Sequence, residues 1–341
     1  MRKIISVENI KTHLFLLILV LVSCGPDAGH FKLDGKLLNL NQGEFLVYST
    51  DGAITGVDTI TVMGGRFTYE AECEQEGTIV IMMPGGQEIP VFVKPGKTFS
   101  LNGDAHNLKE IKVAGSKENE LMNEFRKKTA AKGKDTVPLD EINSFIKGNP
   151  ESAVGKYLVV RYLLGEKPNY PSAQKLLKTM LDKRPDNASL KVLYTQVKDM
   201  EKVSNGKRLP SFTATDLNGK GVTQKDISKG LWIVTSIASW DFESTNQIRR
   251  IKTIVRDEKK DINIMAISFD VNKKLCETSI AFDTEKDIVL FDGKMAESPI
   301  ASCFGIRQTG IAIVISDGKI LERSLYGEPL YTFLKEEIKK R

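Results

Sequence analysis

The period of the hydrophobic pattern changes twice along the chain, and no other feature constrains the fold as strongly. Between about residue 30 and residue 113, short runs of alternating apolar and polar residues are separated by turn signals such as Gly64-Gly65, a pattern typical of antiparallel strands. From Ser116 the apolar residues recur at helical spacing, and after Pro210 buried strands alternate with amphipathic helices. The sequence therefore predicts an α+β multidomain chain: a small antiparallel β domain, a helical connector and a C-terminal α/β domain.

These changes also set the predicted domain boundaries. Helices are expected at residues 139–146, 153–164, 173–181, 190–200, 247–256 and 330–340, and apolar strands at 232–237, 262–268 and 311–316. Strands that alternate with helices indicate parallel crossover units. We expect a signal peptide at 1–23, a tether at 24–30, the β domain at 31–115, the helical connector at 116–205 and the α/β domain at 206–341.

The N-terminal segment has the features of an export signal. Arg2, Lys3 and Lys11 accompany nine consecutive apolar residues at 14–22, which are too few to cross the hydrocarbon core of about 30 Å. Residues 21–24, Leu-Val-Ser-Cys, resemble the lipobox of bacterial lipoproteins. The resemblance implies that Cys24 is diacylated on sulfur and becomes the mature N-terminus. The alternative is an ordinary cleaved signal with an incidental cysteine.

Lipidation of Cys24 would make the membrane a partner of this chain. Two or three acyl chains, at about 0.8 kcal/mol for each buried methylene, hold a protein stably on a bilayer. We therefore expect a lipid-anchored protein of the cell envelope, located at the outer membrane and facing the periplasm.

Composition excludes several classes of function. The chain has 49 Lys and Arg against 44 Asp and Glu, a net charge of +5, without the concentration of basic residues typical of nucleic-acid binding, so no nucleic-acid partner is expected. Its three histidines are His13, His30 and His106, and none lies in the C-terminal two-thirds of the chain. Histidine-dependent nucleophiles and multi-histidine metal sites are therefore not expected. The sequence indicates no metal and no cofactor.

Several motifs carry a resemblance to a known family. The C-terminal motifs are Leu209-Pro210-Ser211-Phe212-Thr213, Asp216-Leu217-Asn218-Gly219-Lys220, residues 232–240, Phe304-Gly305-Ile306 and Asp317-Gly318-Lys319-Ile320. By these motifs, residues 206–341 resemble the thioredoxin-like fold of membrane-anchored, TlpA-like thiol-disulfide oxidoreductases and of the AhpC/TSA superfamily, which also contains peroxidases. The part before it resembles the β-rich N-terminal module of Bacteroidota-type lipoproteins, whose exit motif matches residues 113–119.

The chain departs from this family at the positions that perform its chemistry. In the family, a Cys-x-x-Cys pair opens a helix whose N-terminus stabilises the attacking thiolate. Here Asp241 replaces the attacking cysteine and Ser244 the resolving one, while the groove-forming cis-Pro-Thr corresponds to Thr309-Gly310. Asp241, Ser244 and Thr309 are thus degenerate positions, and no catalytic residue is assigned. Asp is a favourable helix N-cap, which is the role we expect for Asp241.

The other cysteines leave alternatives open. Cys276 is expected to open a helix and Cys303 to lie in the helix before Phe304. Each is either a small core residue or a reactive thiol, or the two form a disulfide, which an oxidising compartment would favour. Cys73 lies in a run of acidic residues at a strand edge of the β domain, where we expect it to be inert.

These expectations favour a binding or scaffold module of the cell envelope, redox-inactive, with an envelope protein or peptide as partner. The resemblance places the candidate binding groove at Trp240, Asp241, Phe242, Thr309 and Gly310. The alternative is a divergent thiol-disulfide oxidoreductase or peroxidase that uses Cys276 or Cys303. A third class is an accessory lipoprotein that binds a small molecule or glycan in a pocket of the β domain.

Overall fold

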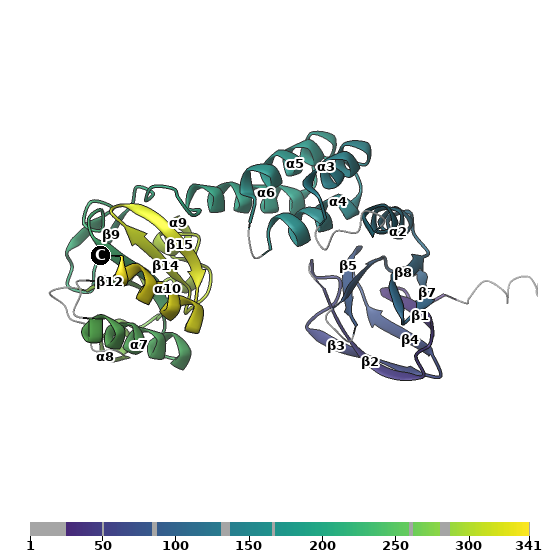
Figure 1. Cartoon of the computed structure of the whole chain (residues 1–341), viewed down its shortest axis with the longest axis horizontal. Helices are drawn as coiled ribbons and strands as arrows, with labels where there is room; N and C mark the ends of the chain where they lie inside the picture. Colours follow the sequence, from purple (N-terminus) through teal and green to yellow (C-terminus); the bar gives the residue numbers. More distant parts are fainter. Residues whose placement is uncertain are drawn as a thin grey trace, which may run out of the picture. The chain divides into compact units, whose positions relative to one another are not determined.

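The computed structural model describes residues 25–49, 51–83, 87–130, 137–165, 168–258, 262–279 and 287–340. The chain divides into two compact units, with the boundary between Leu190 and Lys191 (Figure 1). The first unit contains the β-rich region and most of the helical connector, and the second contains the α/β region. The predicted signal peptide and Cys24 lie outside the described residues, so lipidation and the division into three domains stay predictions.

An eight-stranded sheet forms the core of the first unit. Its strands follow the order β6-β5-β2-β3-β4-β1-β7-β8, and β1 pairs antiparallel with β4 and parallel with β7. All eight strands contribute apolar side chains to one buried cluster, which includes Phe31, Phe45 and Phe99, so the sheet curls around a single core. The strands are β1 (His30–Leu38), β2 (Gln42–Ser49), β3 (Val57–Met63), β4 (Arg66–Glu72), β5 (Gly77–Met82), β6 (Glu88–Val93), β7 (Thr98–Asp104) and β8 (Asn107–Ala114).

Helix α2 (Lys117–Ala130) contacts both edge strands of this sheet, β6 and β8. The side-chain amide of Asn119, which is 1% exposed, accepts a hydrogen bond from the Phe92 N–H of β6 at 2.8 Å and donates one to the Phe92 carbonyl at 3.0 Å. Asn123 makes the same two bonds with Val113 of β8, at 3.1 and 2.7 Å, and Arg126 donates to two further β8 carbonyls. Because exposed edge strands promote aggregation, these side chains protect the sheet at both edges.

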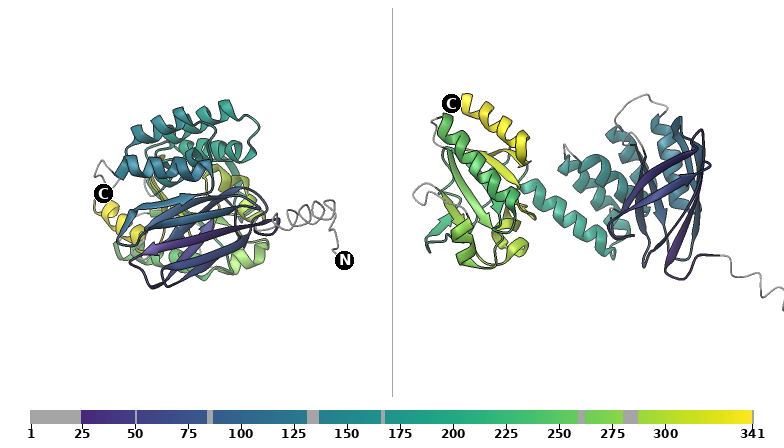
Figure 2. Two further views of the ribbon diagram at one scale, coloured as in Figure 1. Left: turned by 90° about the vertical axis from the view of Figure 1, so that its right-hand side faces the viewer. Right: turned by 90° about the horizontal axis from the view of Figure 1, so that it is seen from below.

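The helices of the connector lie together on one side of the sheet (Figure 2). All four observed ranges differ from the predicted ones, two of them by more than two residues at one end. The expected helix at 153–164 is α4 (Ala153–Leu158) continued by a π-helical turn, Val159–Leu163. Helix α5 (Tyr170–Lys183) begins before the predicted residue 173, because Pro171 lies in the first turn, where a proline needs no N–H partner. The others are α3 (Leu139–Gly148) and α6 (Ala188–Lys202), which runs across the unit boundary.

The second unit is built on a five-stranded mixed sheet of order β13-β12-β11-β14-β15. Strands β11, β12 and β13 are parallel, whereas β14 runs antiparallel to β11. The expectation of parallel crossovers is therefore wrong for β14. This strand turns into β15 through Asp317-Gly318, two residues with positive φ that suit a tight hairpin. The strands are β11 (Leu231–Ile237), β12 (Ile262–Ser268), β13 (Ile288–Leu290), β14 (Ala312–Ser316) and β15 (Lys319–Leu325), with a separate hairpin of β9 (Thr213–Thr215) and β10 (Gly221–Thr223).

Apolar elements cover both faces of this sheet. Ile233 of β11 packs with Ile248 of α7 (Phe242–Glu258) and Leu334 of α10 (Gly327–Lys339), and these two helices lie side by side (Figure 2). The next residue, Val234, faces the opposite cluster, which includes Ile300 of α9 (Pro299–Cys303). Parallel strands, an antiparallel hairpin and helical cover form the mixed α/β arrangement that the resemblance implies. The remaining helices are α8 (Lys273–Ser279) and a short 3-10 turn, Met295–Glu297.

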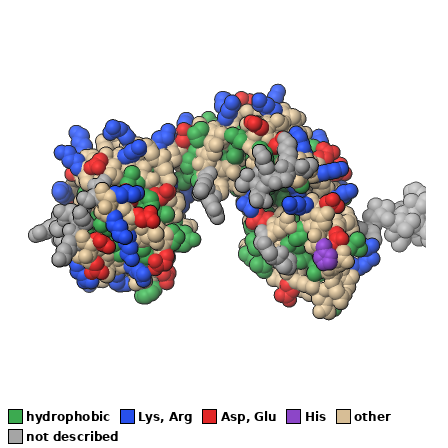
Figure 3. Space-filling view, viewed as in Figure 1, with side chains coloured by type: hydrophobic (Ala, Val, Ile, Leu, Met, Phe, Trp, Pro, Cys, Tyr) green, Lys and Arg blue, Asp and Glu red, His purple; other side chains and the backbone are tan. Residues whose placement is uncertain are grey.

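The described surface gives two further facts about the chain. Within the described residues, no helix combines the length and apolar character needed to cross a bilayer. On the face drawn in Figure 3, basic and acidic side chains are interspersed over each unit.

Candidate functional site

The candidate site lies where β11 ends and α7 begins. Asp241 stands directly before the helix, and its carboxylate accepts a hydrogen bond from the Glu243 N–H at 3.1 Å, which is an N-cap contact. The side chain of Thr309 also hydrogen-bonds to the carboxylate, and the neighbouring Ser244 favours its charged form. Burial raises the pKa of Asp241, but these hydrogen bonds outweigh it and hold the pKa below its usual value. The aspartate is therefore a charged cap.

Ser244 and Gly310 lie beside this cap. Ser244 is 1% exposed, and its hydroxyl accepts from the Ala238 N–H at 3.2 Å and donates to the Asp241 carbonyl at 2.9 Å. A Cβ added to Gly310 would lie 4.0 Å from the Ser244 Cβ, an ordinary contact. Gln247 donates from Nε2 to the Gly310 carbonyl at 2.8 Å. The structure thus brings the degenerate positions Asp241, Ser244 and Thr309 together. The Ser244 hydroxyl is used in hydrogen bonds to the backbone.

Exposed apolar side chains surround this cap. Trp240 and Phe242 are 63% and 68% exposed. Val271 and Leu275, which follow the end of β12, are also exposed. Since β11 and β12 are parallel neighbours, both pairs belong to the same edge of the sheet. We call Trp240, Phe242, Val271 and Leu275 the apolar rim. Exposed apolar side chains gathered in one place are a feature of binding surfaces.

A buried carboxylate that the sequence prediction missed joins the two halves of the rim. Asp270 is 1% exposed and accepts hydrogen bonds from the Ser239 N–H at 2.9 Å, the Ser239 hydroxyl at 2.6 Å and the Ser268 hydroxyl at 2.9 Å. It thereby ties the turn before Trp240 to the end of β12. The sequence signal that could have identified Asp270 is its position just after a predicted strand. Polar residues at the carboxyl ends of parallel strands gather at one edge of a sheet.

The cysteines of the second unit lie outside the first turn of α7, Cys276 in α8 and Cys303 in α9. Cys276 does not open its helix: α8 begins at Lys273, with Asn272 accepting from the Lys274 N–H at 2.9 Å, and places Cys276 at its fourth position, fully buried. Burial raises the pKa of the Cys276 thiol, and it raises that of Cys303 as well. A buried thiol with a raised pKa is a poor nucleophile.

The disulfide that the sequence left open is not formed in the structure. Cys276 and Cys303 are both free thiols. Cys276 packs in the cluster beneath α7 and α10, whereas Cys303 packs against the cluster on the opposite face of the sheet. Cys73 is also free and directly follows β4, where its Sγ donates to the Gln75 carbonyl at 2.8 Å. Burial raises the pKa of the Cys73 thiol.

Comparisons with known proteins match the two parts of the chain separately. Residues 31–122 match a family model described as a domain of unknown function. No relative was found among curated proteins. One similar solved structure is the C-terminal domain of a Bacteroides thetaiotaomicron protein assigned as a thiol-disulfide oxidoreductase, 27% identical, covering 41% of this chain and 99% of that chain, with a TM-score of 0.36. Another is a thiol-disulfide oxidoreductase from Bacteroides fragilis, 26% identical, covering 38% of this chain and 99% of that chain, with a TM-score of 0.34.

The structural neighbours also include the thioredoxin domain of a thiol-disulfide oxidoreductase from Bacteroides vulgatus, 19% identical, covering 40% of this chain and 98% of that chain, with a TM-score of 0.34. Among the described residues of this chain, no group of three or more His, Cys, Asp or Glu side chains is arranged to hold a metal ion.

Proposed function

We propose that this chain is a lipid-anchored protein of the cell envelope whose C-terminal domain binds a polypeptide segment through the apolar rim without thiol chemistry. The observation that carries this proposal is Asp241. It caps α7 at the position where the family has its attacking cysteine, and its carboxylate is held by Thr309 and Ser244. Thiol-disulfide exchange needs a thiolate nucleophile, and a carboxylate supplies no sulfur.

The remaining thiols support the same proposal. The N-terminus of α7 would stabilise a thiolate, but the carboxylate of Asp241 occupies it. Cys276 and Cys303 lie on opposite faces of the sheet and both have raised pKa values. Dithiol exchange requires a thiol of low pKa close to a second cysteine, and neither Cys276 nor Cys303 provides one.

The rim supports a polypeptide as the occupant. Trp240 and Phe242 each expose about two-thirds of their surface, and aromatic side chains are enriched among the residues that dominate binding energy at protein interfaces. Asp270 orders the turn that carries Trp240 before any partner arrives. An ordered surface loses less entropy on binding than a mobile one.

An activity assay tests the absence of thiol chemistry. The full chain should reduce insulin disulfides no faster than buffer with the same reductant. Reduction above that background, lost in the Cys276→Ser, Cys303→Ser double variant, would establish the oxidoreductase alternative and overturn the proposal.

A binding assay tests the rim directly. Insulin B chain with alkylated cysteines and a fluorescent label provides an unfolded polypeptide that cannot exchange disulfides, and fluorescence anisotropy reports its binding. Trp240→Ala and Phe242→Ala should each weaken binding roughly tenfold, as for hot-spot aromatics. Met63→Ala removes an equally exposed side chain from the first unit and is the matched control. Equal affinity in all three variants contradicts the proposed surface.

The lipid anchor has its own test. Cells grown with a labelled fatty acid should incorporate label into the chain, and Cys24→Ala should abolish incorporation. An unlabelled wild-type chain would indicate the ordinary cleaved signal instead.

A further inference from the structure

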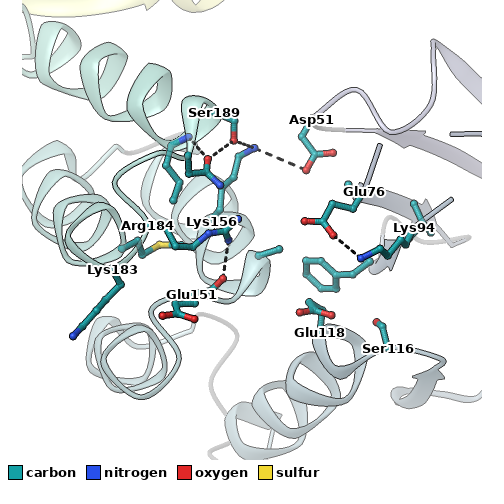
Figure 4. Close-up of a pocket in the computed structure, with 17 residues that line it drawn as sticks. Asp51, Glu76, Lys94, Ser116, Glu118, Glu151, Lys156, Lys183, Arg184 and Ser189 are labelled. Carbon is teal, nitrogen blue, oxygen red and sulfur yellow. Dashed lines mark hydrogen bonds and ion pairs between the residues drawn. The ribbon is translucent and has the colours of Figure 1, made fainter. Parts of the chain in front are cut away.

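A second candidate site lies in the first unit. A cavity of about 530 Å³ opens between the end of β6, the start of α2 and helices α4, α5 and α6. Its volume lies within the range of small-molecule sites, roughly 300–1,000 Å³. Figure 4 shows Lys156 and Arg184 on the helical side of this cavity, with Asp51, Glu76 and Glu118 opposite them. Lys94 pairs with Glu76 at 3.4 Å, and Glu151 lies below Arg184, so both sides carry charges of both signs, with Lys156 and Asp51 facing each other.

The floor of the cavity is apolar. The side chains of Phe92 of β6, Met180 of α5 and Leu190 of α6 line it, and all three are buried. Ligand sites typically combine an apolar lining with a few placed polar groups. This floor can hold an apolar group of a ligand, while the charged side chains above it bind the charged groups of the same ligand.

Lys156 and Asp51, two charged residues of the lining, form an ion pair that stops short of contact. The Lys156 Nζ lies 4.0 Å from the Asp51 Oδ2, and their side chains are only 24% and 17% exposed. This distance is too long for a hydrogen bond. Lys156 donates one hydrogen bond, to the Ser189 hydroxyl at 3.1 Å, although an ammonium has three donors. The Oδ1 atom of Asp51 accepts hydrogen bonds from the Thr78 N–H at 2.8 Å and from the Ser49 hydroxyl. The other carboxylate oxygen, Oδ2, is the one that faces Lys156.

The Lys156 ammonium and the Asp51 carboxylate are both half-buried and can each form further hydrogen bonds. They match a ligand that carries a carboxylate for Lys156 and an ammonium for Asp51. We infer that this cavity binds a free α-amino acid with an apolar side chain. Lys156 and Arg184 take the ligand carboxylate, Asp51 takes its ammonium, and the side chain lies on the apolar floor. The charges of an α-amino acid are attached to one carbon, so they fit neighbouring partners. Arg184 is held in place by the hydrogen bond from its Nη1 to the Glu151 carbonyl at 2.7 Å.

Calorimetric titration of the full chain tests this site independently of the proposed function. L-leucine, L-methionine and L-phenylalanine should bind, because each carries both charges and an apolar side chain. N-acetyl-L-leucine and L-leucinamide each lack one charge and should bind roughly tenfold more weakly or not at all, since a hydrogen bond to a charged group contributes about that factor. Failure of all three amino acids to bind, equal binding of N-acetyl-L-leucine, or preferential binding of a dipeptide overturns the assignment.

Variants locate the site. Lys156→Gln and Asp51→Asn should each weaken leucine binding roughly tenfold, whereas Lys183→Gln, which removes an exposed cation from the same lining, should leave it unchanged. Circular dichroism checks that each variant is folded. If Lys156→Gln does not fold, Arg184→Gln provides the same comparison, because it leaves the Lys156–Asp51 pair intact. Unchanged affinity in the folded Lys156, Asp51 and Arg184 variants overturns the inference.

Discussion

Asp241 combines a local role with a consequence for the whole domain. As an N-cap it satisfies a backbone N–H of the first turn of α7, and as a charged group it interacts favourably with the helix dipole. The side chain that best caps this helix is also one that cannot exchange disulfides. Thr309 adds a contact from a distant part of the chain, so the cap also links α7 to the segment before β14.

Replacing this cap should lower stability in a pH-dependent way. Asp241→Ala should reduce the free energy of unfolding of the second unit by about 1 kcal/mol at pH 7. The pKa of Asp241 is lower in the folded state than its usual value of about 3.9, so its stabilisation is complete above that pH and is lost as the pH falls through the folded-state pKa. Urea unfolding monitored by tryptophan fluorescence from pH 7 to pH 3 measures this, and a difference that stays constant with pH contradicts it.

At the scale of elements, the N-terminus of α7 has the geometry that stabilises a thiolate at the start of a helix. The helix follows a buried strand, and positions 241 and 244 lie in contact at its first turn. Free N–H groups and the helix dipole act on whatever side chain stands there. The absence of thiol chemistry that we propose therefore needs a change of side chains and not of fold.

Restoring the cysteines tests this view. The Asp241→Cys, Ser244→Cys double variant should have a thiol with a pKa below the free value of about 8.5 and should reduce insulin disulfides above background. The pKa is measured from the pH dependence of alkylation. Asp241→Cys alone, which has no resolving partner, serves as the control and should show the lowered pKa without turnover. A thiol of ordinary pKa in both variants would mean that the helix N-terminus does not stabilise a thiolate here.

The second element with a clear role is α2, which satisfies both edges of the eight-stranded sheet. Asn119→Ala removes both hydrogen bonds to Phe92 and leaves two buried backbone groups without partners, so it should cost about 2 kcal/mol or more. Glu120→Ala changes an exposed neighbour on the same helix and should stay within about 0.5 kcal/mol. Urea unfolding followed by far-ultraviolet circular dichroism compares the two, and equal stabilities would contradict this role for Asn119.

For the whole molecule, the division into two units implies that each has its own core and its own response to mutation. The first unit surrounds one cluster, and the second has a cluster on each face of its sheet. Both tryptophans of the chain, Trp232 and Trp240, belong to the second unit. Tryptophan fluorescence therefore reports only that unit, whereas circular dichroism reports both.

This arrangement predicts separable transitions. Asn119→Ala should lower the unfolding midpoint seen by circular dichroism and leave the fluorescence midpoint unchanged, whereas Asp241→Ala should lower the fluorescence midpoint. Sites that are far apart and share no partners act additively, so the double variant should show both changes. A fluorescence midpoint that moves with Asn119→Ala would show that the two units unfold as one cooperative body.

Much of the candidate site was readable before the structure. The motifs around residue 240 and around residue 309 placed Trp240, Asp241 and Thr309 at one site, and the structure brings them together. The expected role of Cys276 at a helix start failed, because a helix boundary depends on which residue caps it, and Asn272 does so earlier. Asp270 was missed because a single acidic residue after a strand gives no sign of which backbone it will contact.

The sequence by itself determined the local properties of this protein: a region of alternating strands, a helical region, a region of alternating strands and helices, and the absence of a Cys-x-x-Cys pair at 241–244. Periodicity and turn residues report these because they depend on neighbours within a few positions. Only the tertiary structure decided that β14 runs antiparallel to β11, that Asn119 protects a sheet edge, and that Lys156 faces Asp51. Those contacts join residues far apart in the chain, and the packing of the whole unit selects among the pairings that local pattern allows.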